Sequence, residues 1–173
     1  MRSTKLITGA LAVVATSSLI GSGAAAYAGE PVTTTETGIL LECSGTWKGE
    51  DVYASVYENN TYGNTVQIVI ADGDVAGGVR ETTRAFKDGR DVRAVMKLKG
   101  KRAVVQGTAR AVGKKTLVHE EHDDAGQHIV VDGFHRKLSK DLTLTWRHRT
   151  VQLDCDTAFA YNLEVTKEST VED

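Results

Sequence analysis

Short segments in which apolar and polar residues alternate make up most of the chain after residue 37. An alternation with a period of two places successive side chains on opposite faces of a β-strand. No segment after residue 28 keeps a helical period for more than two turns. The pattern predicts strands at 39–47, 51–57, 66–71, 78–86, 92–98, 103–112, 116–122, 127–131 with an extension toward Phe134, 142–146, 151–155 and 158–165.

Clusters of Gly, Asp and Asn separate these segments. Asp88-Gly89 is typical of a tight hairpin, because both residues tolerate the positive φ of a type I′ turn. The apolar residues are even-numbered in 142–146 but odd-numbered in 151–155, and a hairpin at 147–149 explains this reversal. Turns at intervals of about 8–12 residues without a helix predict an all-β protein. We expect an antiparallel meander, either closed as a small calycin-like barrel or folded as a sandwich.

The first residues have the pattern of an export signal. Arg2 and Lys5 precede an apolar run at 6–20, and Ala26-Tyr27-Ala28 matches an A-x-A cleavage site. The run is too short to span a bilayer, so we expect a secreted protein without a membrane span. The expected division of the chain is a signal peptide at 1–28, a flexible leader at 29–37, a single β domain at 38–165 and a flexible tail at 166–173.

The charge balance argues against nucleic acid as a partner. The 173 residues include 21 Lys and Arg against 23 Asp and Glu, for a net charge of −2. A nucleic-acid-binding protein needs a clustered basic face, and the charges along this chain are interspersed. The most basic segment, 97–102, is interpreted as a charged turn between two strands.

Cys43 and Cys155 lie near the two ends of the predicted domain. In an exported chain a single pair of cysteines predicts a disulfide, and no C-x-x-C motif indicates redox chemistry. Such a bridge would join the first strand to a strand near the end of the chain.

Three of the five histidines flank one predicted hairpin. A four-residue loop at 123–126 would place Glu121 opposite His128, with His119 on the same face, and such a set could hold Zn²⁺ or Cu²⁺. Asp123 and His122 are reserve ligands. The alternative is a solvated hairpin tip without a metal, and we expect no other cofactor.

Gly45-Thr46-Trp47 resembles the Gly-x-Trp that opens the first barrel strand of lipocalins and related calycins, including the avidin-like barrels. The resemblance implies a Trp that packs across the barrel floor beneath a basic residue from a late strand, here Arg147 or Arg149. The chain lacks the helix that precedes the last lipocalin strand, and no lipocalin ligand is carried over.

Aromatic residues supply the candidate binding surface, at Trp47, Tyr53, Tyr57 and Trp146. Tyr62 and Asn59, Asn60 and Asn64 lie nearby in sequence, a combination that suits contact with a sugar or a protein. Asn59 also begins an N-glycosylation pattern. A ligand cavity would be apolar and lined by Trp47, Tyr53 or Trp146, whereas a solid core would favour recognition at the surface.

No catalytic motif such as G-x-S-x-G occurs in the sequence, so an enzyme is not favoured. The preferred hypothesis is a secreted, non-catalytic binding protein for a small molecule or an extracellular protein. One alternative is a secreted hydrolase or metal-dependent enzyme. Another is a structural or envelope-associated domain without a ligand.

Overall fold

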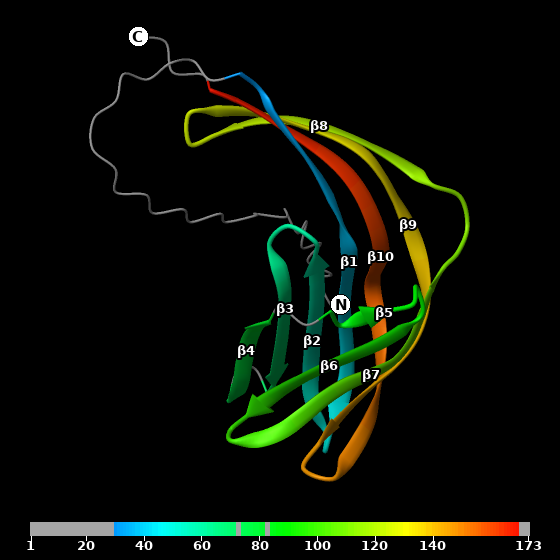
Figure 1. The fold of residues 1–173 in the computed structure, drawn as a ribbon. Helices are drawn as coiled ribbons and strands as arrows, with labels where there is room; N and C mark the ends of the chain where they lie inside the picture. Colours follow the sequence, from blue (N-terminus) through cyan, green and yellow to red (C-terminus); the bar gives the residue numbers. More distant parts are fainter. Residues whose placement is uncertain (1–29, 72–73, 82–83, 170–173) are drawn as a thin grey trace, which may run out of the picture.

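The computed structural model describes residues 30–71, 74–81 and 84–169, so the predicted signal peptide lies outside the described residues. All ten elements that these residues form are β-strands (Figure 1). Their bounds are β1 Val32–Trp47, β2 Glu50–Asn59, β3 Gly63–Ile70, β4 Val75–Glu81, β5 Phe86–Lys87, β6 Asp91–Leu98, β7 Lys101–Ala111, β8 Thr116–Asp124, β9 Gln127–Trp146 and β10 Arg149–Ser169.

The strands form one curled sheet in the order β4-β3-β2-β1-β10-β9-β7-β6-β5, and β8 pairs separately with β9. Every pair is antiparallel, so the all-β, antiparallel prediction is confirmed. The first and last strands are neighbours, which joins two meanders into one sheet. The sheet curls into a half-barrel and extends beyond it at one end (Figure 1).

The half-barrel consists of β2 to β7 with residues 39–47 of β1, 137–146 of β9 and 149–160 of β10. Its inner face is apolar because every second residue of each strand points inward. Buried apolar side chains from these strands pack together in the interior. Its largest fully buried apolar members are Trp146, Ile39, Leu41, Ile68, Ile70, Leu98, Leu142 and Leu144.

Cys43 and Cys155 lie opposite each other on β1 and β10 and form the predicted disulfide. The register between these strands shifts beside the bridge, because Glu42 pairs with Thr157 and leaves Asp156 as an extra residue. The extra residue of this β-bulge reverses whether the odd-numbered or the even-numbered residues of β10 face inward, so that apolar residues on both sides of the bulge face the core. The predicted strands 151–155 and 158–165 are therefore one continuous strand.

The extension, which we call the arch, consists of β8 with residues 32–38 of β1, 127–136 of β9 and 161–169 of β10. It is a single layer of four strands in the order β1-β10-β9-β8, and Figure 1 shows it curving away from the half-barrel. β1 begins at Val32, so residues 32–37 of the expected leader are a paired strand. Likewise, β10 continues to Ser169 in the expected tail. Each end of the domain is longer because the other end supplies its pairing partner.

β7 and β8 pair with successive halves of the same edge of β9. β7 occupies residues 138–146 of β9, and β8 occupies residues 127–135. A connection at 112–115 joins them, where Arg136 Nη2 donates a hydrogen bond of 3.2 Å to the Gly113 carbonyl. No helix in the described residues is long and apolar enough to cross a membrane.

Removing the disulfide is expected to destabilise the whole domain, because the bridge closes a separation of 112 residues. The chain-entropy model gives a loss of up to about 4–5 kcal/mol for the double variant Cys43→Ala/Cys155→Ala. Urea unfolding monitored by tryptophan fluorescence would measure this loss. Reduction of the wild type should reproduce it and leave the variant unchanged, whereas a loss below about 1 kcal/mol contradicts the bridge's role.

Candidate functional site

Two of the predicted ligand-binding residues, Trp47 and Trp146, lie buried at the end of the half-barrel opposite the arch. Their ring centroids are 4.9 Å apart. Trp146 is 1% exposed, and its Nε1 donates a hydrogen bond of 3.2 Å to the Leu98 carbonyl. The Lys48 ammonium lies 4.9 Å from the Trp47 ring and the Arg147 guanidinium 4.4 Å from the Trp146 ring. Arg147 thus covers Trp146, whereas the resemblance implied a late basic residue over Trp47, which is covered instead by Lys48 from the turn after β1.

The other two predicted residues lie elsewhere. The Tyr53 hydroxyl, on the outside of the sheet, donates a hydrogen bond of 3.3 Å to Glu42. Burial of the Tyr53 ring raises the pKa of its hydroxyl. Tyr57 packs against Tyr161 on the same outer face. The structure therefore does not gather the four residues around one cavity.

A depression does occur on the outer surface of the half-barrel, away from these aromatic residues. It has a volume of about 380 Å³ and lies over β6, β7 and β9. It is shallow and open, unlike the enclosed, mostly apolar pockets that bind small molecules. Its lining residues are Asp91, Val92, Arg93, Gln106, Gly107, Asp141 and Thr143.

Four aromatic side chains form a continuous row, which we call the ring ladder, where the arch meets the half-barrel. The centroid distances are 5.2 Å from His135 to Phe159, 6.4 Å from Phe159 to Tyr161 and 6.3 Å from Tyr161 to Tyr57. Tyr161 crosses over Gly38 of β1, and its hydroxyl donates a hydrogen bond of 2.8 Å to the Glu58 carbonyl. Burial is the main reason why the pKa of Tyr161 is raised. The ladder thus ties β9 and β10 to β2 across β1.

A buried polar network beside the ladder holds the tip of the β2–β3 hairpin against β1. Asn59 Nδ2 donates to Glu36 at 2.8 Å and to the Tyr57 hydroxyl at 2.9 Å. The Asn59 side-chain oxygen accepts hydrogen bonds from two backbone N–H groups of the turn. The Asn60 side chain bridges the backbone of Thr35 and Thr37.

The side-chain amides of Asn59 and Asn60 are thus hydrogen-bonded within the fold. Asn59 is only 2% exposed, so the predicted glycosylation acceptor is buried. The pKa of the nearby Tyr62 hydroxyl is raised, first by burial and then by the negative charge of Glu36. These contacts are consistent with a network that fixes the arch to the half-barrel.

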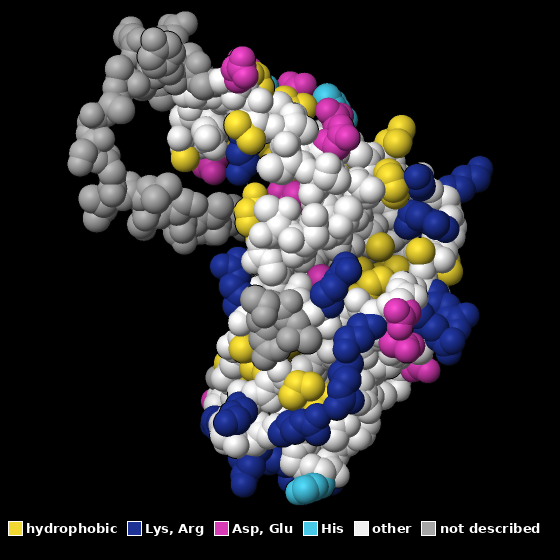
Figure 2. All heavy atoms as spheres, in the orientation of Figure 1, with side chains coloured by type: hydrophobic (Ala, Val, Ile, Leu, Met, Phe, Trp, Pro, Cys, Tyr) yellow, Lys and Arg dark blue, Asp and Glu magenta, His cyan; other side chains and the backbone are white. Residues whose placement is uncertain are grey.

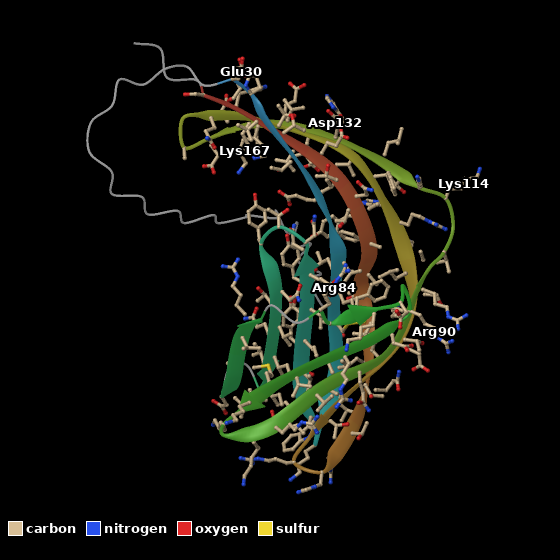
Figure 3. All side chains as sticks on the ribbon, viewed as in Figure 1. Glu30, Arg84, Arg90, Lys114, Asp132 and Lys167 are labelled. Atoms are coloured by element: carbon tan, nitrogen blue, oxygen red, sulfur yellow. A yellow bond between two sulfur atoms is a disulfide. The ribbon has the colours of Figure 1, made fainter. Side chains whose placement is uncertain are left out.

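Glu58 is a buried carboxylate at the end of the half-barrel that adjoins the arch. It is 2% exposed and accepts hydrogen bonds of 2.9 Å from Arg84 Nε and from the backbone N–H of Phe86. Arg84, labelled in Figure 3, keeps most of its side chain in solvent. The ion pair connects β2 to the segment before β5, and both carboxylate oxygens are thereby satisfied.

The β8–β9 hairpin differs in register from the prediction. Its loop has two residues, because Ala125 adopts a positive φ of 50° beside Gly126. His128 therefore lies opposite Asp123 rather than opposite Glu121, and its Nδ1 is 2.9 Å from Asp123 Oδ1. His119 Nδ1 lies 2.7 Å from Asp132, and its Nε2 lies 3.3 Å from Glu121.

The predicted metal ligands are only partly brought together. His119 contacts Glu121, and His128 lies on the same face of the hairpin but pairs with another carboxylate. Among the described residues, no group of three or more His, Cys, Asp or Glu side chains is arranged to hold a metal ion. Metal binding by this hairpin stays a prediction of the sequence.

The outer edge of β8 is the most exposed part of the sheet. β8 pairs only with β9 within the described chain, and all of its residues except Val118 are exposed. Leu117 is 83% exposed. The nine residues include Glu120, Glu121, Asp123 and Asp124 but no Lys or Arg. The sequence pattern identified this segment as a strand, but periodicity does not reveal which strand lies at an edge.

Comparisons with known proteins identify no family. No protein-family profile matches the chain, and no curated protein matches it. Among solved structures, the chain is similar to one named as a putative AttH from Nitrosomonas europaea, with 10% identity and a TM-score of 0.29. The match covers 80% of this chain and 52% of that one, so the chain spans about half its length. At this TM-score the likeness says nothing about the function of the chain.

Gly38 is expected to tolerate no side chain, because Tyr161 crosses the sheet over it. A Cβ at this position would lie 2.6 Å from the Tyr161 hydroxyl and would collide with the Glu58 carbonyl. We expect Gly38→Ala to lower the free energy of unfolding by about 1–3 kcal/mol. Gly78→Ala is the matched control in another strand, since its nearest neighbour would be 3.7 Å away. Equal losses for the two variants, measured by urea unfolding, would contradict the close approach of Gly38 to the Glu58 carbonyl and the Tyr161 hydroxyl.

His119 and His128 should titrate above the ordinary histidine pKa of 6.5. The hydrogen bond to Asp132 raises the pKa of His119, and the hydrogen bond to Asp123 raises that of His128. These pairs stabilise the hairpin below pH 6.5, and the stabilisation is lost as the pH rises through the raised pKa values.

NMR titration of the imidazole protons would measure both values. Asp132→Asn should lower the pKa of His119 and leave that of His128 nearly unchanged, because His128 has its own carboxylate. Asp123→Asn should have the reverse effect. If both histidines shifted equally in both variants, the two specific pairings would be wrong.

Proposed function

We propose that this protein is a non-catalytic binding protein that acts outside the cytoplasm and accepts a basic, extended segment of a protein partner on the outer edge of β8. The observation that carries this proposal is the exposed edge of β8, which has a described pairing partner on one side only. An edge strand presents a row of backbone donors and acceptors, and an extended peptide can pair with them.

The charge of β8 selects the partner. Four carboxylates in nine residues would face other carboxylates if two copies of β8 paired, which disfavours self-association. A strand rich in Lys or Arg would instead place opposite charges side by side. The same acidic residues thus reject one class of strand and favour another. Asp132 of β9, labelled on the arch in Figure 3, adds a carboxylate opposite His119 of β8.

The filled half-barrel supports recognition at the surface. Trp47 and Trp146 are packed core residues at the end of the half-barrel opposite the arch. A lipocalin-like ligand would need an apolar cavity in their place. The exposed Leu117, at 83%, offers an apolar contact beside the acidic edge. The Cys43–Cys155 bridge is compatible with the oxidising environment outside the cytoplasm, and so is the export signal expected from the sequence.

A labelled nine-residue peptide that alternates lysine with valine and threonine is a direct probe. We expect fluorescence anisotropy to show binding to the full chain that weakens as salt is raised. The same peptide with alternate backbone nitrogens methylated should lose binding, because it keeps its charge but cannot complete the ladder. A peptide with glutamate in place of lysine should not bind.

Charge reversal then locates the site. We expect Glu120→Lys/Asp124→Lys to weaken binding at least about tenfold, since both residues lie on the β8 edge. The matched control, Glu164→Lys/Glu168→Lys, makes the same change in net charge on β10, away from the edge. The proposal is wrong if both pairs of substitutions weaken binding equally, or if the methylated peptide binds as well as the unmodified one.

A further inference from the structure

The end of the half-barrel opposite the arch gathers basic residues from three distant parts of the sequence. The turns β1–β2, β6–β7 and β9–β10 all lie at this end, which we call the floor. Their first residues are Lys48, Lys99 and Arg147. Figure 2 shows Lys and Arg side chains spread over the lower half of the molecule, whereas several acidic side chains lie at the top of the arch. Further exposed bases flank these turns, at Lys97, Lys101, Arg102 and Arg149, with His148 beside them.

The three turn bases occupy backbone positions that favour other residues. Lys48, Lys99 and Arg147 have positive φ values of 57°, 45° and 48°. Gly, Asn and Asp adopt this conformation most readily, and they are the residues that two-residue hairpins prefer. The chain instead places a cation at the same position in three separate turns. Choices that go against local preference in this way tend to occur where function requires them.

The floor cations are held in place but are not neutralised. Lys48 and Arg147 lie over the buried Trp47 and Trp146 rings, which keeps their stems against the floor. No ion pair within the described residues involves any of the floor bases. Seven Lys and Arg side chains thus face only three carboxylates at this end of the described chain, those of Glu50, Asp51 and Asp74.

We propose that the floor binds the surface of an anionic phospholipid bilayer through these basic turns. Three turns that project from one end of the half-barrel present their charges to a broad surface rather than around a pocket. The four exposed large hydrophobic residues of the described chain are Val32, Tyr53, Val112 and Leu117, and none lies in a floor turn. The contact is therefore electrostatic adsorption to lipid headgroups, without insertion. In this orientation the arch points away from the bilayer, so its β8 edge stays accessible.

Vesicle co-sedimentation of the full chain tests the proposal. We expect binding to vesicles of phosphatidylcholine with 30% phosphatidylglycerol at about 0.05 M NaCl, and loss of that binding at about 0.5 M NaCl. Vesicles of phosphatidylcholine alone report any binding that the apolar run at 6–20 contributes. Equal binding to the two kinds of vesicle would overturn the proposal.

The triple variant Lys48→Asn/Lys99→Asn/Arg147→Asn removes the turn bases while keeping a residue that accepts a positive φ. Each base lost at an anionic surface weakens binding by roughly fivefold, so we expect about a hundredfold loss for the three. The control Lys87→Gln/Arg110→Gln/Lys114→Gln removes three exposed bases elsewhere and should change binding by less than about threefold. Thermal unfolding by circular dichroism verifies that both variants fold.

Two further binding results would contradict the proposal. One is equal binding of the two triple variants to the anionic vesicles. The other is binding of the wild type to heparin or to an RNA oligonucleotide without binding to the vesicles, because the partner would then be a soluble polyanion. Size-exclusion chromatography in the same buffers checks whether the basic floor instead binds the acidic arch of a second copy, and a floor-dependent oligomer would likewise overturn the bilayer proposal.

Discussion

The fold depends above all on the pairing of its first and last strands. β1 and β10 lie side by side from Val32 to Ser44, and this one ladder joins the β1–β4 meander to the strands that end the chain. Bringing together segments so far apart in sequence carries a large entropic cost. The Cys43–Cys155 bridge lies within the ladder and offsets part of this cost by restricting the unfolded chain. The buried interior of the half-barrel draws its side chains from strands on both sides of this ladder.

The same ladder also creates the arch. β1, β9 and β10 are longer than the half-barrel needs, and their extra length continues as a sheet of one layer. Such a layer lacks a second sheet that would bury its apolar face. The ring ladder and the Glu36–Asn59 network compensate where the arch leaves the half-barrel, since they fix it to the β2–β3 hairpin. Farther out, β9 is the one strand of the described chain that pairs with β8, and the acidic residues of β8 protect the edge from unwanted pairing.

Local pattern predicts much of this fold. Most strand segments, the Asp88-Gly89 turn, the hairpin near Arg147 and the disulfide follow from period-two alternation, turn chemistry and the cysteine count, and the structure contains them. The predicted strand 78–86 is wrong in its bounds, because β4 ends at Glu81 and β5 begins at Phe86. The predicted strands 127–131 and 142–146 are parts of one strand, β9. The continuity of β10 was not predictable, because the bulge at Asp156 reverses the parity that periodicity relies on. The register of the β8–β9 hairpin was missed because Ala125 takes a backbone conformation that its side chain gives no reason to expect.

The surfaces on which the proposals rest depend on which parts of the chain the fold brings together. The sequence therefore indicated only some of their residues. The segment 97–102 by itself is a charged turn, and it becomes part of a basic floor only when the sheet brings Lys48 and Arg147 to the same end. In the same way, the sequence indicates that 116–122 is an acidic strand, but only the order of strands in the sheet shows that this strand lies at an edge. The tryptophan candidates illustrate another limit of the sequence, because composition does not distinguish a packed tryptophan from one that lines a cavity.

The shared edge of β9 has a consequence for how the molecule opens. Because β7 and β8 pair with separate halves of that edge, β8 can detach while the β7–β9 ladder and the core beneath it remain intact. The free energy of such an opening is set by one ladder and a few exposed side chains, and it is therefore far smaller than that of global unfolding. We therefore expect β8 to open as a unit of its own, and its amides should exchange with solvent long before those of the half-barrel.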